Sequence, residues 1–253
     1  MMRRVLALTT HFRLPHEGMV EYEVLSRGSA IVGKRMVDKD PTRFHVLTCA
    51  HVACPWLFPS YYPNDWLQHV DERFIKYTVA LHDLVSNDKV WEFQLENRVM
   101  LHSSRDFAVL ELDANVNKQP DLDGCDLSAL VAMETGLPLE YHGHIEPFSG
   151  VIQPLTVPGS FFWANPTTHQ VFGKSEPVLE QGMCGGAVTS NDCVVGLIEG
   201  IVPEKEGASS AYKTLENAVA FVDLKEITQF VHDVEVFPAE VNTLFTNTLA
   251  SME

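Results

Sequence analysis

The sequence is poor in basic residues and has no long apolar run, and each absence excludes a class of function. Its 18 lysines and arginines face 34 aspartates and glutamates, so the 253-residue chain has a formal net charge of −16. A nucleic-acid-binding face needs clustered Lys and Arg, and Lys34-Arg35 is too small a cluster. No stretch approaches the roughly 18 apolar residues that span a bilayer. We expect no nucleic acid as primary partner and no membrane span, and the acidity favours solubility over a basic partner.

A glycine-rich turn, the Cys184 turn, carries the first candidate site residue. It reads Gln181-Gly182-Met183-Cys184-Gly185-Gly186-Ala187. Gly182 permits the unusual backbone angles that point two N–H groups into one hollow. We predict that Cys184 is a nucleophile and that the N–H groups of Gly182 and Cys184 form an oxyanion hole. Gly185 and Gly186 are expected to keep side chains away from a substrate.

Two further segments supply a base and an acid. Residues 44–52 form an apolar run ending in Thr-x-Ala-His, with His51 in the turn, and residues 104–112 form another with Asp106 near its start. The order His, Asp, nucleophile is that of chymotrypsin, and differs from that of subtilisin and of the α/β-hydrolases. These segments resemble the chymotrypsin/trypsin-like peptidase family, most closely its HtrA-like branch, with Cys in place of the nucleophilic Ser. The resemblance extends over residues 21–231.

The resemblance implies an all-β fold, a trypsin-like double β-barrel with a short C-terminal helix. The expected strands include residues 28–33 as the first of the barrel, 43–47, a hairpin of 76–85 and 89–100, and 107–112. The predicted parts are an N-terminal extension (1–20), a first β-barrel lobe (21–113), an interlobe linker (114–126), a second β-barrel lobe with its closing helix (127–232) and a C-terminal tail (233–253).

By the same resemblance, the site lies between two barrels and hydrolyses peptide bonds through a thioacyl-enzyme. His51 takes the proton of Cys184 and returns it to the leaving amine, while Asp106 holds the imidazole tautomer. A neighbouring imidazolium favours a thiolate, so an ion pair can exist before substrate arrives. Viral chymotrypsin-like cysteine proteases have the same substitution. The residues expected to bind substrate are Glu199, Gly200 and Ile201 on a strand, and Val178 at the pocket base, which favours a small or apolar side chain over Arg or Lys.

Departures from the family pattern keep a second function open. Met183 replaces the Asp that forms the activation salt bridge in secreted members, Ala187 replaces Pro, and cellular members seldom use Cys as nucleophile. The alternative is an inactive pseudoprotease that acts as a binding module or as a structural subunit of a larger assembly, with a mitochondrial assembly as one option. The partner is then a protein instead of a polypeptide substrate. The aromatic segment, residues 56–74, either packs on its own lobe, covers the cleft or docks a partner. The retained His51 and Asp106 favour activity.

No metal or cofactor is expected. His142-Gly143-His144 would place two imidazoles on one face of a strand. No third ligand has a recognisable zinc-site spacing, and Cys49 and Cys54 form no Cys-x-x-Cys pair. The histidines alone are more simply structural.

Cysteine usage and the N-terminus bear on the compartment. The cysteines are Cys49, Cys54, Cys125, Cys184 and Cys193. Their number is odd, and Val52 stands where secreted relatives carry a cysteine after the catalytic His, so we expect reduced thiols and an intracellular location. Residues 1–16 contain three arginines and no acid. This pattern fits a mitochondrial presequence or an ordinary basic N-terminus, which leaves mitochondrial and cytosolic locations open, the former slightly favoured.

Overall fold

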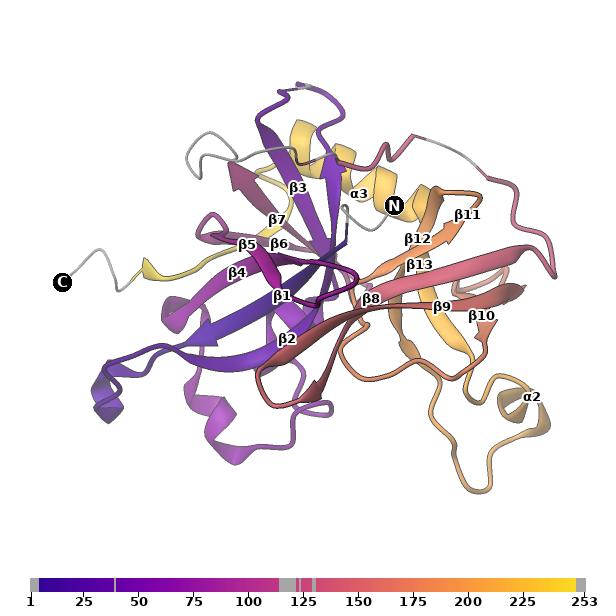
Figure 1. Ribbon diagram of the computed structural model, residues 1–253, viewed down its shortest axis with the longest axis horizontal. Coiled ribbons are helices and arrows are strands. Elements are labelled where there is room, and N and C mark those ends of the chain that lie inside the picture. The colour runs from indigo at the N-terminus through magenta and orange to yellow at the C-terminus, as the bar shows by residue number, and fades with distance from the viewer. Residues whose placement is uncertain (1–4, 39, 114–121, 123, 129–130, 249–253) are drawn as a thin grey trace.

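The chain forms two antiparallel β-sheets that lie side by side (Figure 1). The computed structural model describes residues 5–38, 40–113, 122, 124–128 and 131–248. The first sheet contains β1 (Val5–Phe12), β2 (Glu23–Lys34), β3 (Arg43–Thr48), β4 (Ile75–His82), β5 (Lys89–Gln94), β6 (Arg98–Leu101), β7 (Ala108–Asp113) and β14 (Asn242–Phe245). The second contains β8 (Pro138–Phe148), β9 (Val151–Ala164), β10 (Val171–Ser175), β11 (Ala187–Ser190), β12 (Cys193–Ile201) and β13 (Val219–Asp223).

Short helices connect the strands. The α-helices are α1 (Ala50–Ala53), α2 (Ser210–Lys213) and α3 (Leu224–Val236), and single 3₁₀ turns span Pro15–Glu17, Pro55–Leu57, Asp65–His69 and Glu72–Phe74. In the described part of the chain, none of the helices has the length and apolar character needed to cross a membrane.

The second sheet closes into a six-stranded barrel in the order β10-β13-β12-β11-β8-β9. Strand β12 is apolar almost throughout because both of its faces are buried. Val195 and Ile198 face the barrel core, whereas Val194 and Leu197 belong to the core of the other lobe. A continuous apolar run of this length is typical of a strand buried on two sides.

The first sheet curls without closing by strand pairing. Its order is β14-β6-β7-β3-β2-β1-β4-β5. Between β5 and β6 the Leu95 N–H donates to the Tyr77 C=O of β4, and the Glu96 N–H donates to the Glu111 C=O of β7. The chain between β5 and β6 therefore crosses from one end of the curled sheet to the other.

Both sheets follow the same order of pairing. Five strands of each sheet show this order: β1, β2, β3, β4 and β7 in the first sheet, and β8, β9, β10, β11 and β13 in the second. In each set of five, the first strand pairs with the second and the fourth, and the third strand pairs with the second and the fifth. The expectation of a mostly β molecule with two barrel-like lobes and a short helix is confirmed.

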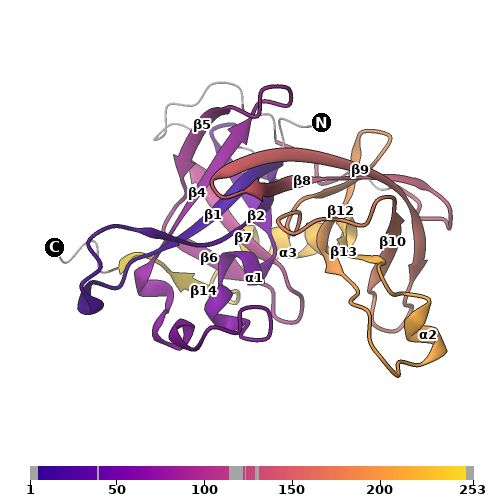
Figure 2. The same cartoon turned by 60° about the horizontal axis from the view of Figure 1, so that its bottom comes forward.

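The predicted ends of the first lobe need correction. Of the predicted extension 1–20, residues 5–12 belong to the sheet, because β1 pairs with both β2 and β4 and is largely buried, and residues 1–4 lie outside the described residues. Residues 28–33 thus belong to the second strand of the lobe. Of the predicted tail 233–253, residues 242–245 form β14, which pairs with β6 and lies with the first lobe (Figure 2), and residues 249–253 lie outside the described residues.

The region between the lobes also differs from the prediction. Most of the predicted linker, 114–121 and 123, lies outside the described residues. The backbone of Cys125 forms an isolated β-bridge with Gly33 of β2. Leu127, the predicted start of the second lobe, is buried in the first-lobe core. The first strand of the second barrel begins at Pro138.

Helix α3 leaves the second barrel and packs on the first lobe. Its N-terminus is capped by Asp223, whose side chain accepts the Glu226 N–H, a common N-cap. The buried residues repeat at helical spacing and belong to the first-lobe core: Leu224, Ile227, Phe230, Val231 and Val234. This apolar stripe joins the two lobes.

Candidate active site

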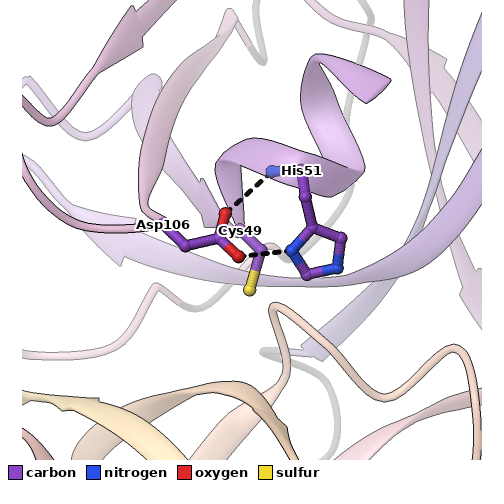
Figure 3. Close-up of side chains that lie close together, drawn as sticks. All are labelled: Cys49, His51 and Asp106. Carbon is purple, nitrogen blue, oxygen red and sulfur yellow. Dashed lines mark hydrogen bonds and ion pairs between the residues drawn. The ribbon is translucent and has the colours of Figure 1, made fainter. Parts of the chain in front are cut away.

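His51 and Asp106 meet on the first lobe. His51 lies in α1, directly after β3, and Asp106 precedes β7, the strand that pairs with β3. One carboxylate oxygen of Asp106 is 2.5 Å from His51 Nδ1, and the other accepts the His51 backbone N–H at 2.8 Å (Figure 3). This double contact fixes both the position and the tautomer of the ring, leaving Nε2 for other partners.

The surroundings of His51 favour the imidazolium. Burial lowers its pKa, but hydrogen bonds with Asp106 and with the side chain of Cys184 outweigh this and raise it to about 9. The ring is therefore charged near neutral pH. It brings a positive charge to the thiol of Cys184, although the two residues are far apart in sequence.

Helix α3 supports the segment that carries Asp106. Arg105 forms an ion pair with Glu226 at 2.9 Å. Phe230 packs edge-on against Phe107, with ring centroids 5.5 Å apart, and against His102 at 4.9 Å. These contacts come from the second lobe to both sides of Asp106, so lobe docking and the placement of the carboxylate are linked.

The Cys184 turn lies between β10 and β11 on the second lobe. Gly182 and Gly185 have φ values of +102° and +85°. A Cβ at Gly182 would lie 2.7 Å from the His144 carbonyl oxygen, and one at Gly185 only 2.1 Å from that of Ser29. Glycine is required here because neighbouring backbone crowds the turn, a reason beyond the predicted need to clear a path for substrate.

Met183 anchors the turn without a charge. Its side chain is 1% exposed and belongs to the second-barrel core. Apolar burial thus holds the turn in place on the second lobe.

The N–H groups of the Cys184 turn divide into paired and unpaired donors. The paired donors are Met183 to Glu180, Gly185 to Ile198 and Gly186 to Met183. Within the described residues, the N–H groups of Gln181, Gly182 and Cys184 have no acceptor. The last two are the donors that the sequence predicts for an oxyanion hole.

Cys49 is a second cysteine close to His51, and it was not assigned to the site from the sequence. In the described part of the chain it forms, with His51 and Asp106, a group whose potential ligand atoms lie within 4.8 Å of one another (Figure 3). Its thiol donates to the Ile198 carbonyl at 3.0 Å, and burial raises its pKa well above the ordinary value. A protonated thiol beside an already bonded His–Asp pair is a poor metal site, because a ligand must be a thiolate.

The residues predicted to bind substrate fall into two groups. Gly200 and Ile201 pair with β13 on one edge only within the described chain, and Glu199 is left without a partner at a bulge. Nothing lies within 4 Å of the place a Gly200 Cβ would take. The Glu199 side chain instead turns inward at a bulge. Burial and the Asp106 carboxylate raise its pKa, and it accepts the Asp106 backbone N–H. Val178 is 44% exposed, so it forms no closed pocket floor.

The aromatic segment covers His51. The Tyr61 ring stacks on the imidazole with centroids 4.8 Å apart and 14° between planes, and Phe58 approaches both. Tyr61 remains 60% exposed. The composition of the segment indicated an aromatic loop, but its contact with His51 depends on tertiary folding.

A cavity of about 330 Å³ adjoins the Cys184 turn. It lies between the lobes and is bordered by Gln181 and Gly182, by Tyr62 of the aromatic segment and by an ion pair between Arg27 and Glu146. The remaining wall combines apolar side chains of both lobes with the polar side chains of Thr9, Ser26 and His144; the apolar ones are Leu8, Val24, Leu25, Ile145 and Ile152.

The other histidines and cysteines have structural environments. Both ring nitrogens of His142 contact threonine hydroxyls at 2.9 Å, those of Thr156 and Thr189. Burial lowers the pKa of His144 to about 3. All five cysteines are free, with Cys184 and Cys193 the two that are partly exposed.

Comparison with known proteins adds no family. A scan against protein-family models finds no match, and a search of curated proteins finds none either. The resemblance to trypsin-like peptidases therefore stays a prediction from the sequence motifs.

Proposed function

We propose that the protein is a trypsin-like-fold endopeptidase whose nucleophile is Cys184. The observation that carries the proposal is the convergence of the His51–Asp106 pair from one lobe with the Cys184 turn from the other. Two barrel-like sheets with one order of pairing support the trypsin-like assignment.

In the proposed reaction, the thiolate of Cys184 attacks the carbonyl carbon of the scissile peptide. The developing oxyanion accepts hydrogen bonds from the free N–H groups of Gly182 and Cys184. His51, charged before the reaction, gives its proton to the leaving amine, which departs as the thioester forms. A water then attacks the thioester with His51 as base, releasing the acid and the thiol. Asp106 acts by holding the ring.

The proposed substrate is an extended polypeptide. Its N-terminal side is expected to pair with the free edge of residues 199–201, since an unpaired strand edge accepts a peptide by β-augmentation. Its leaving-group side is expected to enter the cavity beside Gly182, whose walls carry both apolar and polar side chains.

One observation favours the alternative of an inactive binding module or assembly subunit. The Tyr61 ring lies on His51, so an aromatic group already occupies the face of the imidazole. In a pseudoprotease this stack would be permanent. In an enzyme, the Tyr61 ring must either leave room for the substrate or move away from His51 when the substrate binds.

Thiol reactivity distinguishes the two. The protein is treated with iodoacetamide from pH 5 to 9, and the modified cysteines are located by mass spectrometry. Cys193, the other partly exposed thiol, is the internal control. We expect Cys184 to react at least about tenfold faster than Cys193 near pH 6, and His51→Ala to remove the difference. Equal rates, unchanged in the variant, would contradict the proposal and favour the binding module.

A further inference from the structure

Ser29 forms two hydrogen bonds with the Cys184 turn, although no motif in the sequence points to this residue. It lies on β2 of the first lobe and is fully buried. Its N–H donates to the Cys184 carbonyl at 2.8 Å, and its hydroxyl donates to the Gly182 carbonyl at 2.9 Å. The same hydroxyl accepts the backbone N–H of His144 on β8 at 2.8 Å. One residue therefore joins the first lobe, the second barrel and the turn.

These bonds fix the peptide groups that flank the Cys184 N–H. The Gly182 carbonyl belongs to the Gly182–Met183 peptide, and the Cys184 carbonyl belongs to the Cys184–Gly185 peptide. The Met183–Cys184 peptide, which carries the free Cys184 N–H, lies between them. Its own carbonyl accepts the Gly186 N–H, and Ser29 holds the peptide groups on both sides, so a rotation of the Cys184 N–H would also strain the bonds to Ser29. Such preorganised donors are the main source of oxyanion stabilisation.

Ser29 is itself held in place. Its carbonyl accepts the hydroxyl of Thr48 at 2.7 Å, and Thr48 ends β3, three residues before His51. A continuous set of hydrogen bonds thus connects the strand before the base with the turn that carries the nucleophile. The connection is independent of the contact between His51 and Cys184.

We propose that Ser29 is a positioning residue that orients the oxyanion donors of the Cys184 turn. This inference rests on the proposed function, and it makes a distinct claim: the hydroxyl acts on the turn and leaves the thiol–imidazole pair unchanged. Reactions at Cys184 that develop an oxyanion should depend on Ser29, whereas those that do not should be indifferent to it.

The experiment compares two reactions at one sulfur. With p-nitrophenyl acetate, the thiolate forms a C–S bond and the C–O bond breaks to release p-nitrophenolate, through an oxyanion. With iodoacetamide, the thiolate displaces iodide and no oxyanion forms. We expect Ser29→Ala to slow acylation of Cys184 about tenfold and to change alkylation less than about twofold.

The matched control is Ser26→Ala. Ser26 is another buried serine of β2, and its hydroxyl donates to a backbone carbonyl, that of Val52, at 2.7 Å. That carbonyl keeps a second donor, Thr10. Ser26→Ala therefore removes a comparable bond without touching the Cys184 turn, and it should leave the ratio of acylation to alkylation unchanged. Ser29→Cys, with a weaker donor, is expected to lie between wild type and Ser29→Ala, and it keeps the test available if alanine prevents folding.

Hydrogen exchange over residues 180–187 decides the inference even if the chain is no enzyme. We expect amides of the turn to exchange about tenfold faster in Ser29→Ala than in Ser26→Ala. Unchanged exchange, or an equal loss of acylation and alkylation, would overturn the role of Ser29. A wild type in which Cys184 reacts no faster than Cys193 would overturn the proposed function instead.

Discussion

The two lobes place their chemistry on equivalent connections. In each sheet the connection between the third and fourth strands points to the site: β3 to β4 in the first lobe contains His51 and the aromatic segment, and β10 to β11 in the second contains Cys184. The last connections differ. Asp106 lies between β6 and β7, whereas the segment between β12 and β13 contains α2 and no residue of the site.

The lobes also differ in what completes them. The second barrel closes with its own strands. The first lobe takes β14 onto the edge of β6 and receives the apolar face of α3, both from sequence that follows the second barrel. The lobe that carries the base and its carboxylate therefore depends on the C-terminal part of the chain. The experiments below test this difference, in decreasing order of expected effect.

Removing Cys184, the proposed nucleophile on the second lobe, should have the largest effect on the rate of peptide hydrolysis. Cys184→Ala leaves no nucleophile and is expected to lower peptide hydrolysis at least about 10⁴-fold. Asp106→Asn should cost less than the roughly 10⁴-fold of a serine triad, because a thiol loses its proton more readily than a hydroxyl. Initial rates on a peptide library measure both, with Cys193→Ala as a control expected to be unchanged. Substantial hydrolysis by Cys184→Ala would show that the chemistry lies elsewhere.

The first lobe should be sensitive to the buried carboxylate of Glu235 on α3, which contacts His45 of β3; burial lowers the pKa of His45, so this contact is a hydrogen bond donated by a neutral imidazole. Glu235 and His45 have side chains 1% and 0% exposed, and their atoms approach to 2.7 Å. Glu235 also accepts the N–H groups of Met36 and Val37. A hydrogen bond to a charged acceptor contributes about 1.5–3 kcal/mol. Glu235→Ala removes the bonds to Met36, Val37 and His45, so we expect it to lower the free energy of unfolding by at least about 3 kcal/mol.

Denaturant unfolding measures this loss, and Asp233→Ala, a more exposed position on the same helix, serves as its control. Burial raises the pKa of Glu235, but the bonds to Met36, Val37 and His45 lower it overall. The sign follows: the stabilisation is present above the pKa of an unfolded Glu and is lost as pH falls through the lower native value. A loss no larger than that of Asp233→Ala would mean that the lobe does not depend on α3 in this way.

The positive charge on His51 should contribute to the free energy of unfolding near neutral pH, and this contribution should be lost at alkaline pH. Its pKa is raised from 6.5 to about 9, equivalent to roughly 3 kcal/mol for the charged form. The contribution is complete below pH 6.5 and is lost as pH rises through about 9. The difference in unfolding free energy between wild type and His51→Ala should shrink over that range. A difference that is constant from pH 6 to 10 would exclude a charged imidazole.

The sequence revealed the site residues better than their supports. His51, Asp106 and Cys184 each stand in a short local pattern, and the structure brings them together. Ser29 was not identified, because it meets Gly182 across 153 positions of sequence and a serine in a strand has no pattern of its own. Strand β14 has four residues, too few for a periodicity. The inward turn of Glu199 depends on a bulge that only strand pairing creates.

The smallest effect is expected where the lobes meet at the surface. Arg27 of β2 pairs with Glu146 of β8, with side chains 28% and 31% exposed. Solvent screens such a pair, so a double-mutant cycle of Arg27→Ala and Glu146→Ala should give a coupling below about 1 kcal/mol, smaller still in 0.5 M salt. The buried contacts of α3 and Ser29 would then account for lobe docking. A coupling above about 3 kcal/mol would reverse this ranking, because the ion pair at the cavity mouth would hold the lobes together and high salt would loosen the site.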